Sequence, residues 1–218
     1  MPKYTTVLFD FDGTLVDSSL GIFRSLQYAF KADGKSEPDF ADLRCFIGPP
    51  LTDSFKEFYG YDDENAVRMV EKYRERYKNE GLLEAEVYKG IPELLKILKA
   101  NKIKIATASS KPKQFIVKIL KVMGLYEYFD YIGGIDFNSG DLTKKAIIEM
   151  ALNSLNITDK SSCIMVGDRC FDIDGANGAE ISSIGVLYGF GSEKEFIENK
   201  ATYIANSPAD IQKIILGG

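Results

Sequence analysis

The sequence predicts an α/β fold in which a doubly wound parallel sheet carries an inserted, all-helical domain. From Gly90 onward, apolar strand patterns alternate with amphipathic helix patterns, as in parallel sheets covered by helices on both faces. A further apolar run, residues 7–9, stands near the start, and only helical patterns separate it from the alternating region. A chain of 218 residues has room for such an insertion. We therefore assign residues 1–15 and 84–218 to the α/β core domain and residues 16–83 to the helical insertion.

The spacing of apolar residues predicts each element. Three apolar residues in a row at 7–9 are typical of a strand buried on both faces of a sheet. Ile22, Leu26 and Phe30 share one face of a helix, for which Asp17-Ser18-Ser19 offers N-cap residues. The same reasoning predicts helices at residues 19–31, 51–59, 63–80, 91–100, 113–123, 144–155, 172–179 and 208–216. It predicts strands at residues 7–9, 103–108, 131–135, 162–166, 182–186 and 201–205.

Composition excludes several classes of function. The net charge of -5 and the pI near 5.0 argue against binding to nucleic acid or to a membrane surface, which both need basic patches. The start of the sequence leads directly into a strand, and no apolar segment approaches a transmembrane length. The three cysteines lack CxxC spacing and fit reduced thiols. We expect a cytoplasmic protein that acts on a small molecule, with no nucleic-acid polymer and no membrane as partner.

Histidine is absent from the sequence. This excludes a histidine general base, a Ser-His-Asp triad, phosphohistidine chemistry and zinc held by histidine. Catalysis must therefore rely on carboxylates, lysine, hydroxyl groups or a hard cation.

Two aspartates follow the first strand at the edge where open α/β sheets bind their ligands. In an extended chain, alternation points Asp10 and Asp12 in the same direction. Two like charges held close together are unfavourable unless a cation neutralises them or one carboxyl group holds a proton. The alternative is a polar turn that caps the next helix, and an isolated pair of this kind fits either interpretation.

Two other strands also end in polar residues. Ser109 and Ser110 offer hydroxyl and backbone N–H groups beside a helix start, which suit phosphate oxygens, although an N-cap is the alternative. Asp168 and Asp172 follow a strand and a glycine, and together with Asp10 they predict an oxygen-rich Mg²⁺ site rather than a structural cap.

Lys144 and Lys145 begin a helix, where a cation opposes the helix dipole. A carboxylate or phosphate group nearby would explain a lysine there. About 100° of helix rotation separates the two side chains, so only one of them can face the site. Lys145 fits a solvated side chain.

These segments, in this order, resemble the four motifs of the haloacid dehalogenase (HAD) superfamily. They are Asp10-Phe11-Asp12-Gly13-Thr14-Leu15-Val16-Asp17-Ser18, Ser109-Ser110-Lys111-Pro112, Lys144, and Gly167-Asp168-Arg169-Cys170-Phe171-Asp172. The resemblance spans nearly the whole chain and implies a Rossmann-like core with a helical cap domain. The chain is similar to the phosphoglycolate phosphatase branch, which the Gly48-Pro49-Pro50-Leu51 turn supports. The segments 167–169 and 185–189 also resemble 5′-nucleotidases of the superfamily.

The resemblance implies a role for each aspartate. Asp10 would attack phosphorus to form an aspartyl-phosphate, and Asp12 would act as general acid and then as general base. Asp10, Asp168 and the backbone carbonyl of Asp12 would bind Mg²⁺. Asp172 would support this metal site from behind its direct ligands.

The same resemblance places substrate-binding groups around the aspartates. Ser109, the amide of Ser110 and Lys144 would hold the phosphoryl oxygens, and Gly13 would leave room for the phosphate. Lys144 matches the family's spacing better than Lys145 does. The implied activity is Mg²⁺-dependent hydrolysis of a small phosphorylated metabolite. Phosphoglycolate is the first candidate, and a 5′-nucleotide or pyrophosphate is the alternative.

Other branches of the superfamily fit the sequence less well. A dehalogenase does not use the second aspartate, and phosphonatases have alanine there, whereas this chain has Asp12. Sugar-phosphate mutases of the superfamily use a histidine of the cap domain, and this chain has no histidine. A phosphatase is therefore expected.

Three competing interpretations come from outside this family. Cys163 and Arg169 have the Cys-x5-Arg spacing of cysteine-dependent phosphatases, but a cysteine inside an apolar strand is inert. A phospho-receiver domain has about half this length and no helical insertion. A catalytically inactive binding module would not need all of these motif residues.

The helical insertion offers three candidate contacts to substrate, namely Arg44, Phe46 and the turn Gly48–Leu51. Arg44 suits the carboxylate of phosphoglycolate, but it fits an exposed helix charge equally well. Phe46, Phe55 and Tyr59 suit stacking on a base, yet their helical spacing is more typical of core residues.

Overall fold

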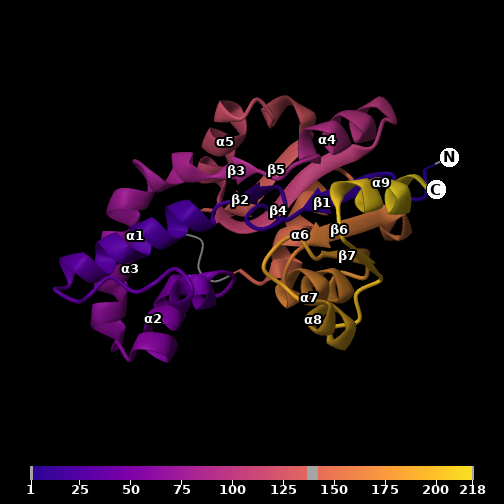
Figure 1. Cartoon of the computed structure of the whole chain (residues 1–218). Coiled ribbons are helices and arrows are strands. Elements are labelled where there is room, and N and C mark those ends of the chain that lie inside the picture. Colours follow the sequence, from indigo (N-terminus) through magenta and orange to yellow (C-terminus); the bar gives the residue numbers. More distant parts are fainter. Residues whose placement is uncertain (1, 137–141, 218) are drawn as a thin grey trace. The chain divides into compact units, whose positions relative to one another are not determined.

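The computed structural model describes residues 2–136 and 142–217. Contacts along the chain divide it into two compact units, and the chain passes between them after Asp17 and after Glu86 (Figure 1). The first unit comprises Met1–Asp17 and Val87–Gly218, and the second comprises Ser18–Glu86. That the second unit acts as a cap over an active site stays a prediction.

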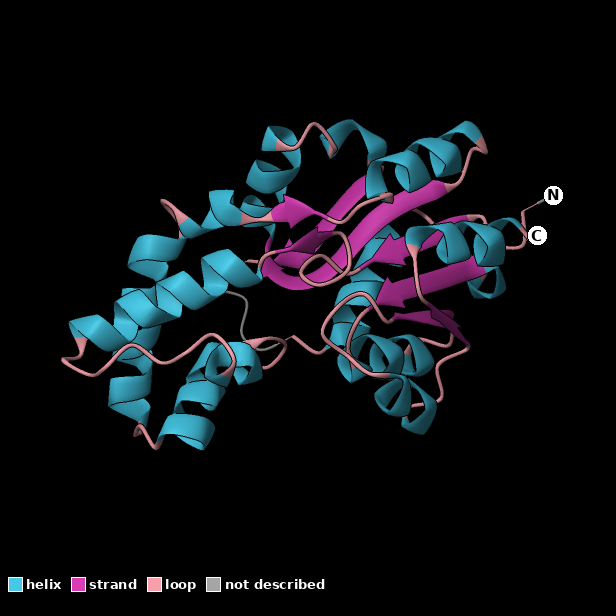
Figure 2. Cartoon of the chain, in the orientation of Figure 1, coloured by secondary structure: helices cyan, strands magenta, loops and turns pink. Residues whose placement is uncertain are grey.

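The first unit is built on a six-stranded sheet with the strand order β5-β4-β1-β6-β7-β8 (Figure 2). Every neighbouring pair in this sheet runs parallel. The strands are β1 (Thr6–Phe9), β4 (Lys104–Pro112), β5 (Tyr131–Ile135), β6 (Cys163–Gly167), β7 (Ser182–Val186) and β8 (Tyr203–Ala205). The predicted fold class, a parallel sheet flanked by helices, is therefore confirmed.

Strand β1 lies between β4 and β6, and this order positions the polar strand ends. Phe9, the last residue of β1, pairs with Thr107 of β4 and Val166 of β6. The residues that follow these three positions therefore reach the same edge of the sheet at the same level. Asp10 lies at the centre of that edge, with polar segments of β4 and β6 on either side.

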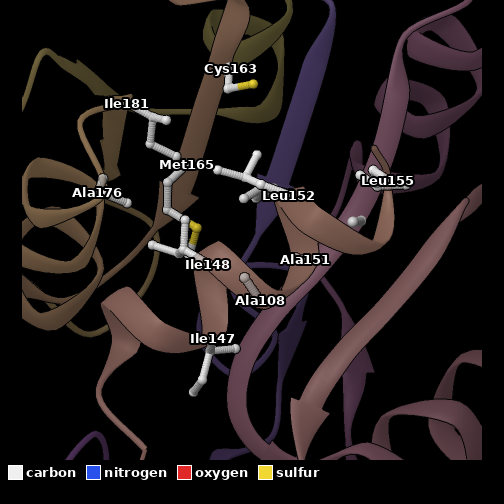
Figure 3. Packing of buried hydrophobic residues seen from close by; sticks show 13 residues of the cluster. Ala108, Ile147, Ile148, Ala151, Leu152, Leu155, Cys163, Met165, Ala176 and Ile181 are labelled. Carbon is white, nitrogen blue, oxygen red and sulfur yellow. The ribbon is translucent and has the colours of Figure 1, made fainter. Parts of the chain in front are cut away.

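In the part of the chain that the structure describes, six α-helices and two short 3₁₀-helices accompany the sheet. They are α4 (Ile91–Ala100), α5 (Lys113–Val122), η3 (Tyr126–Tyr128), α6 (Lys144–Ser154), η4 (Lys160–Ser162), α7 (Cys170–Gly178), α8 (Glu193–Glu198) and α9 (Pro208–Leu216). Figure 3 shows how α6 packs on the sheet, with Ile148 beside Met165 of β6. Ile148, Ala151 and Met165 are fully buried, so α6 is fixed against the sheet by apolar contacts along its length.

Several element bounds differ from the sequence prediction; for example, helix α3 (Asp63–Tyr77) ends three residues before the predicted end at residue 80. Strand β4 continues to Pro112 instead of ending at residue 108, because an irregular register after Ala108 keeps the segment extended beside β5. Helix α7 begins at Cys170 rather than at residue 172. Helix α8 is too short and polar to show a clear apolar period, and it was not predicted.

The second unit contains helices and short 3₁₀ segments. They are α1 (Ser19–Ala32), η1 (Asp42–Phe46), α2 (Leu51–Tyr59), α3 (Asp63–Tyr77) and η2 (Gly81–Glu84). Rings pack at its centre, with centroids 4.6 Å apart for Phe30 and Tyr59 and 4.8 Å apart for Phe46 and Phe55. These aromatic residues therefore belong to the core of the unit, where ring pairs add to the stability gained by burial.

Two short strands lie in the segments that connect the two units. β2 (Val16–Asp17) and β3 (Glu86–Val87) form a two-stranded sheet.

Ser18 precedes α1, but its side chain caps no backbone N–H. Its hydroxyl is buried and has no hydrogen-bond partner within residues 2–136 and 142–217. No described helix is both long and apolar enough to span a bilayer.

Candidate active site

Asp10 is the first residue of the candidate site along the chain, and it directly follows the buried central strand β1. Its backbone N–H donates a hydrogen bond to the carbonyl of Val166 at 2.8 Å, which continues the pairing of β1 with β6. Its side chain is 13 % exposed, and Oδ1 accepts a hydrogen bond from Lys144 Nζ at 2.6 Å. The carboxylate is therefore held at the sheet edge while part of it stays accessible.

Lys144 lies in the first turn of α6 and points into a group of oxygen atoms. Besides Asp10, its Nζ lies 2.7 Å from Asp172 Oδ1 and donates to the carbonyl of Ala108 at 3.0 Å. Burial alone would lower the pKa of Lys144, but Asp10 and Asp172 outweigh it and raise the pKa above its usual value. Lys145 instead has a side chain that is 51 % exposed. Of the two lysines, Lys144 is the one that faces the carboxylates.

Asp10, Asp168 and Asp172 form an acidic cluster in which one carboxylate oxygen of each lies within 4.8 Å of the others. Burial, with the nearby charges of Asp172 and Asp10, raises the pKa of Asp168 well above its usual value. Burial and the charge of Asp10 raise the pKa of Asp172 to about 6, although Lys144 opposes this shift. The Lys144 ammonium group contacts Asp10 and Asp172, and the oxygens of all three carboxylates lie close together. Such a set of oxygen ligands fits a hard divalent cation.

Asp172 differs from its two neighbours because both of its carboxylate oxygens already contact the protein. Oδ1 lies beside Lys144, and Oδ2 accepts a hydrogen bond at 3.1 Å from the backbone N–H of Arg169, which precedes α7. Asp172 therefore fixes both Lys144 and the start of α7. The role of Asp172 in supporting the direct metal ligands, which the family resemblance implies, stays a prediction.

Asp168 is enclosed by two loops that approach it very closely. Thr14 Oγ1 donates to Oδ1 at 3.3 Å, and the backbone N–H of Phe190 donates to Oδ2 at 2.9 Å. A Cβ atom on Gly13 would lie 2.2 Å from Asp168 Oδ2, and one on Gly189 would lie 2.4 Å from Asp168 Cβ. Gly13 also has a φ of +82°, which L-residues with a side chain rarely adopt. Glycine at these positions allows the loops to pack on Asp168, whereas the predicted role of Gly13 in admitting phosphate stays a prediction.

The loop after β7 is a part of the site to which sequence reasoning gave no role. Tyr188 Oη donates a hydrogen bond to the carbonyl of Thr14 at 2.9 Å, and its ring lies 4.9 Å from that of Tyr88. This contact ties the loop after β7 to the turn after β1. The spacing of Gly189 and Gly191 directly after a strand was the available signal, because it marks a close approach of backbone.

Replacing Gly189 by Ala should disturb Asp168 directly. The new methyl group would overlap both Asp168 Cβ and the carbonyl of Gly13, each 2.4 Å away. We expect a loss of about 1–3 kcal/mol in the free energy of unfolding and weaker binding of divalent cations. Urea unfolding and Mn²⁺ binding followed by electron paramagnetic resonance measure the two effects. Gly178→Ala is the matched control, since its methyl group would first meet the flexible Lys145 side chain at 3.3 Å. Unchanged Mn²⁺ affinity in Gly189→Ala would show that this loop does not position Asp168.

Asp12 does not join the acidic cluster with its side chain. Its two carboxylate oxygens accept hydrogen bonds from Lys111 Nζ at 2.8 and 2.9 Å. Lys111 was part of a recognised motif, but the sequence reasoning gave it no role. The expected binding of Mg²⁺ by the backbone carbonyl of Asp12 stays a prediction.

The remaining predicted substrate contacts lie in different parts of the chain. Ser109 is buried in β4, where its Oγ accepts a hydrogen bond at 3.3 Å from the backbone N–H of Lys111, and Ser110 is exposed. Arg44 is exposed on η1 and belongs to the second unit. Contacts of these three residues with substrate stay predictions.

The geometry opposes the cysteine-dependent alternative. Cys163 is fully buried at the start of β6, within the apolar cluster shown in Figure 3, and burial raises the pKa of its thiol. Arg169 lies beyond the other end of β6, where its Nε donates to Glu195 Oε1 at 3.2 Å. The two residues therefore do not form a phosphate-binding loop.

Comparison with known proteins identifies the family of this chain. The family model of haloacid dehalogenase-like hydrolases matches residues 7–186. A protein of Pseudomonas aeruginosa named 5′-nucleotidase is 38 % identical over 213 residues, covering 98 % of this chain and 96 % of the relative. A pyrophosphatase named PpaX from Halalkalibacterium halodurans is 33 % identical, covering 98 % of this chain and 97 % of the relative. The crystal structure of a phosphatase from Clostridium difficile superposes with a TM-score of 0.91 at 42 % identity, covering 98 % of this chain and 99 % of that one.

The matched region contains the edge of the sheet described above. It includes β1 with Asp10, the polar end of β4, Lys144 at the start of α6, and Asp168 after β6. The relatives match this chain over nearly its full length rather than over one motif. The chain belongs to the family of haloacid dehalogenase-like hydrolases.

Proposed function

We propose that this hydrolase is a Mg²⁺-dependent phosphomonoester hydrolase that works through a phosphorylated Asp10. The observation that carries the proposal is the contact of Lys144 with Asp10 at 2.6 Å, beside the buried carboxylates of Asp168 and Asp172. A carboxylate nucleophile needs this combination, because a cation both orients it and reduces its repulsion from an anionic phosphate.

In the first step, a carboxylate oxygen of Asp10 forms a bond to phosphorus while the bond to the leaving alcohol oxygen breaks. Asp12 gives its proton to that oxygen, so a neutral alcohol leaves. The products of this step are the alcohol and an aspartyl-phosphate at position 10. Lys144, the Ser109 hydroxyl and the Ser110 amide hold the phosphoryl oxygens in this proposal.

In the second step, a water molecule attacks the phosphorus atom of the aspartyl-phosphate. Asp12, now a carboxylate, takes a proton from the water, and the bond between phosphorus and the Asp10 oxygen breaks. Inorganic phosphate leaves, Asp10 returns to a carboxylate and Asp12 to the protonated form. Two easier displacements replace one difficult attack of water on the ester.

Asp10 and Asp168 would hold the metal ion directly with their side chains, together with the backbone carbonyl of Asp12. Asp172 would support them, because its oxygens contact Lys144 and the Arg169 N–H. Mg²⁺, when bound, supplies positive charge that neutralises the transferring phosphoryl group.

The substrate class is a small phosphorylated metabolite. A nucleoside 5′-monophosphate is supported by the 5′-nucleotidase relative at 38 % identity, and pyrophosphate by the PpaX relative at 33 %. Phosphoglycolate is supported by the motif resemblance and the Gly48–Leu51 turn. We place the reaction in the cytoplasm, which the three free thiols support.

A panel of phosphate compounds tests this proposal. We expect release of inorganic phosphate from at least one nucleoside 5′-monophosphate, phosphoglycolate, sugar phosphate or pyrophosphate in the presence of Mg²⁺. EDTA should abolish the release, and added Mg²⁺ should restore it. No turnover of any compound, or turnover that persists in EDTA at the same rate, would contradict the proposal.

A further inference from the structure

We propose that Lys111 is a positioning residue that sets the orientation of the Asp12 carboxyl group for proton transfer at the leaving oxygen. This inference rests on the proposed function, in which Asp12 is the general acid and base. Its starting point is the contact of Lys111 Nζ with both Asp12 oxygens, at 2.8 and 2.9 Å. One ammonium group that contacts both oxygens holds the Asp12 side chain in place through charge-assisted hydrogen bonds.

The burial of the two side chains indicates which one faces the reacting atoms. The Lys111 side chain is 5 % exposed, whereas that of Asp12 is 22 % exposed. Asp12 is therefore the more accessible member of the pair. This arrangement favours a role through Asp12 over direct contact of Lys111 with the phosphate group.

An irregularity of β4 turns Lys111 toward Asp12. Ala108 pairs with Gly133 of β5, and Pro112 pairs with Ile135, so β4 uses four steps where β5 uses two. The extra length lies at residues 109–111, and irregularities of this kind often re-aim side chains beside active sites. A Cβ on Gly134 would lie 2.8 Å from the carbonyl of Lys111, so glycine lets β5 follow this path closely.

Two lysines thus contact two aspartates that are separated by a single residue. Lys144 reaches Asp10 from α6, and Lys111 reaches Asp12 from β4. Within residues 2–136 and 142–217, every hydrogen bond recorded to the Asp12 carboxylate comes from Lys111. Because a lysine this deeply buried needs a counter-charge, the pair also fixes where the Lys111 ammonium can lie. Removing Lys111 would leave the Asp12 side chain free to rotate.

The test compares substrates whose leaving groups differ in their need for a proton. p-Nitrophenyl phosphate releases a stable phenolate, whereas an alkyl phosphate needs a proton from the general acid. Single-turnover release of the leaving group reports the first step alone. In Lys111→Met, we expect this rate to fall by roughly 100-fold for the alkyl phosphate hydrolysed fastest in the panel above. For p-nitrophenyl phosphate, we expect the rate to change by less than about threefold, because its phenolate leaving group needs little general acid catalysis.

A double-mutant cycle separates positioning from direct binding of phosphate. In the Asp12→Asn background, Lys111→Met should change the alkyl phosphate rate by less than about twofold, because the group that Lys111 positions is gone. A loss that persists in this background, or equal losses for both substrates, would show that Lys111 binds the phosphate group itself. A faster alkyl phosphate rate in Lys111→Met would show that Lys111 holds Asp12 away from the leaving oxygen. Each of these results would overturn the inference.

Two further variants keep the test interpretable. Lys113→Met is the control, because Lys113 is exposed two residues away and should leave both rates unchanged. Lys111→Arg keeps a cation that can donate two hydrogen bonds, so it should restore at least part of the alkyl phosphate rate if Lys111→Met folds poorly. Failure of Lys111→Arg to exceed Lys111→Met in a folded protein would contradict positioning. If the unmodified chain releases no leaving group at all, the proposed function fails instead.

Discussion

Replacing Asp10 by Asn should lower kcat by a factor of at least about 10⁴, the order of magnitude that removal of a nucleophile costs. Asparagine keeps the size and shape of the side chain but cannot form the acyl-phosphate. Its amide can still accept a hydrogen bond from Lys144, which contacts Asp10 at 2.6 Å in the unmodified protein. The fold should therefore persist while turnover stops. Steady-state release of phosphate from the best substrate of the panel measures this effect.

The control for this prediction is Asp174→Asn. Asp174 is an exposed carboxylate on α7, close in sequence to the acidic cluster but outside it. It should keep full activity, which separates the loss of one carboxylate from the loss of the Asp10 nucleophile. An Asp10→Asn protein that retains a hundredth or more of the unmodified rate would argue that water attacks the phosphate directly.

Replacing Lys144 by Met should affect both activity and stability. The change removes the ammonium that lies 2.6 Å from Asp10 and 2.7 Å from Asp172, and it leaves their charges in a buried site. Breaking a buried ion pair by removing one partner costs about 3–5 kcal/mol of unfolding free energy. Without divalent cations, we expect the unfolding free energy to fall by this amount at pH 8 and by less at pH 5. The difference arises because acid protonates carboxylates whose pKa burial has raised, such as Asp172 with its pKa of about 6.

Lys145→Met is the matched control, since Lys145 is the next residue on the same helix and is half exposed. Urea unfolding at both pH values, with and without Mg²⁺, measures the stability of the two variants. Added Mg²⁺ should narrow the gap for Lys144→Met, because a cation in the acidic cluster would replace part of the lost charge. Equal stability of the two variants at pH 8 would contradict the role assigned to Lys144.

Much of the core unit could be predicted from local patterns. The apolar run at residues 7–9 and the helical spacing of Ile147, Ile148 and Ala151 indicate which faces are buried. The position of charged residues directly after strands predicts that Asp10 and Asp168 lie at one sheet edge. These patterns are local in sequence. Because the strands pair in parallel, the residues that follow them reach the same edge of the sheet, so the local patterns are sufficient to place these residues.

The contacts that could not be predicted depend on irregular backbone. Nothing in the sequence marks Lys111 as buried, because its direction depends on the altered register of β4 against β5. The hydrogen bond from Tyr188 to the carbonyl of Thr14 joins residues far apart in the chain, and no periodic pattern in the sequence predicts it. Ser18 has the residue type of an N-cap, yet its backbone places the hydroxyl elsewhere. Local propensity fails in these places because tertiary contacts set the geometry.

The identity of the phosphorylated residue is the central claim, and trapping the intermediate tests it most directly. The best substrate of the panel is mixed with the protein and quenched in acid within one turnover. Borohydride then reduces any aspartyl-phosphate to homoserine, and mass spectrometry locates the homoserine in the sequence. We predict homoserine at position 10 and nowhere else. Recovery of unmodified Asp10 from protein quenched during turnover, or homoserine at another aspartate, would contradict the account.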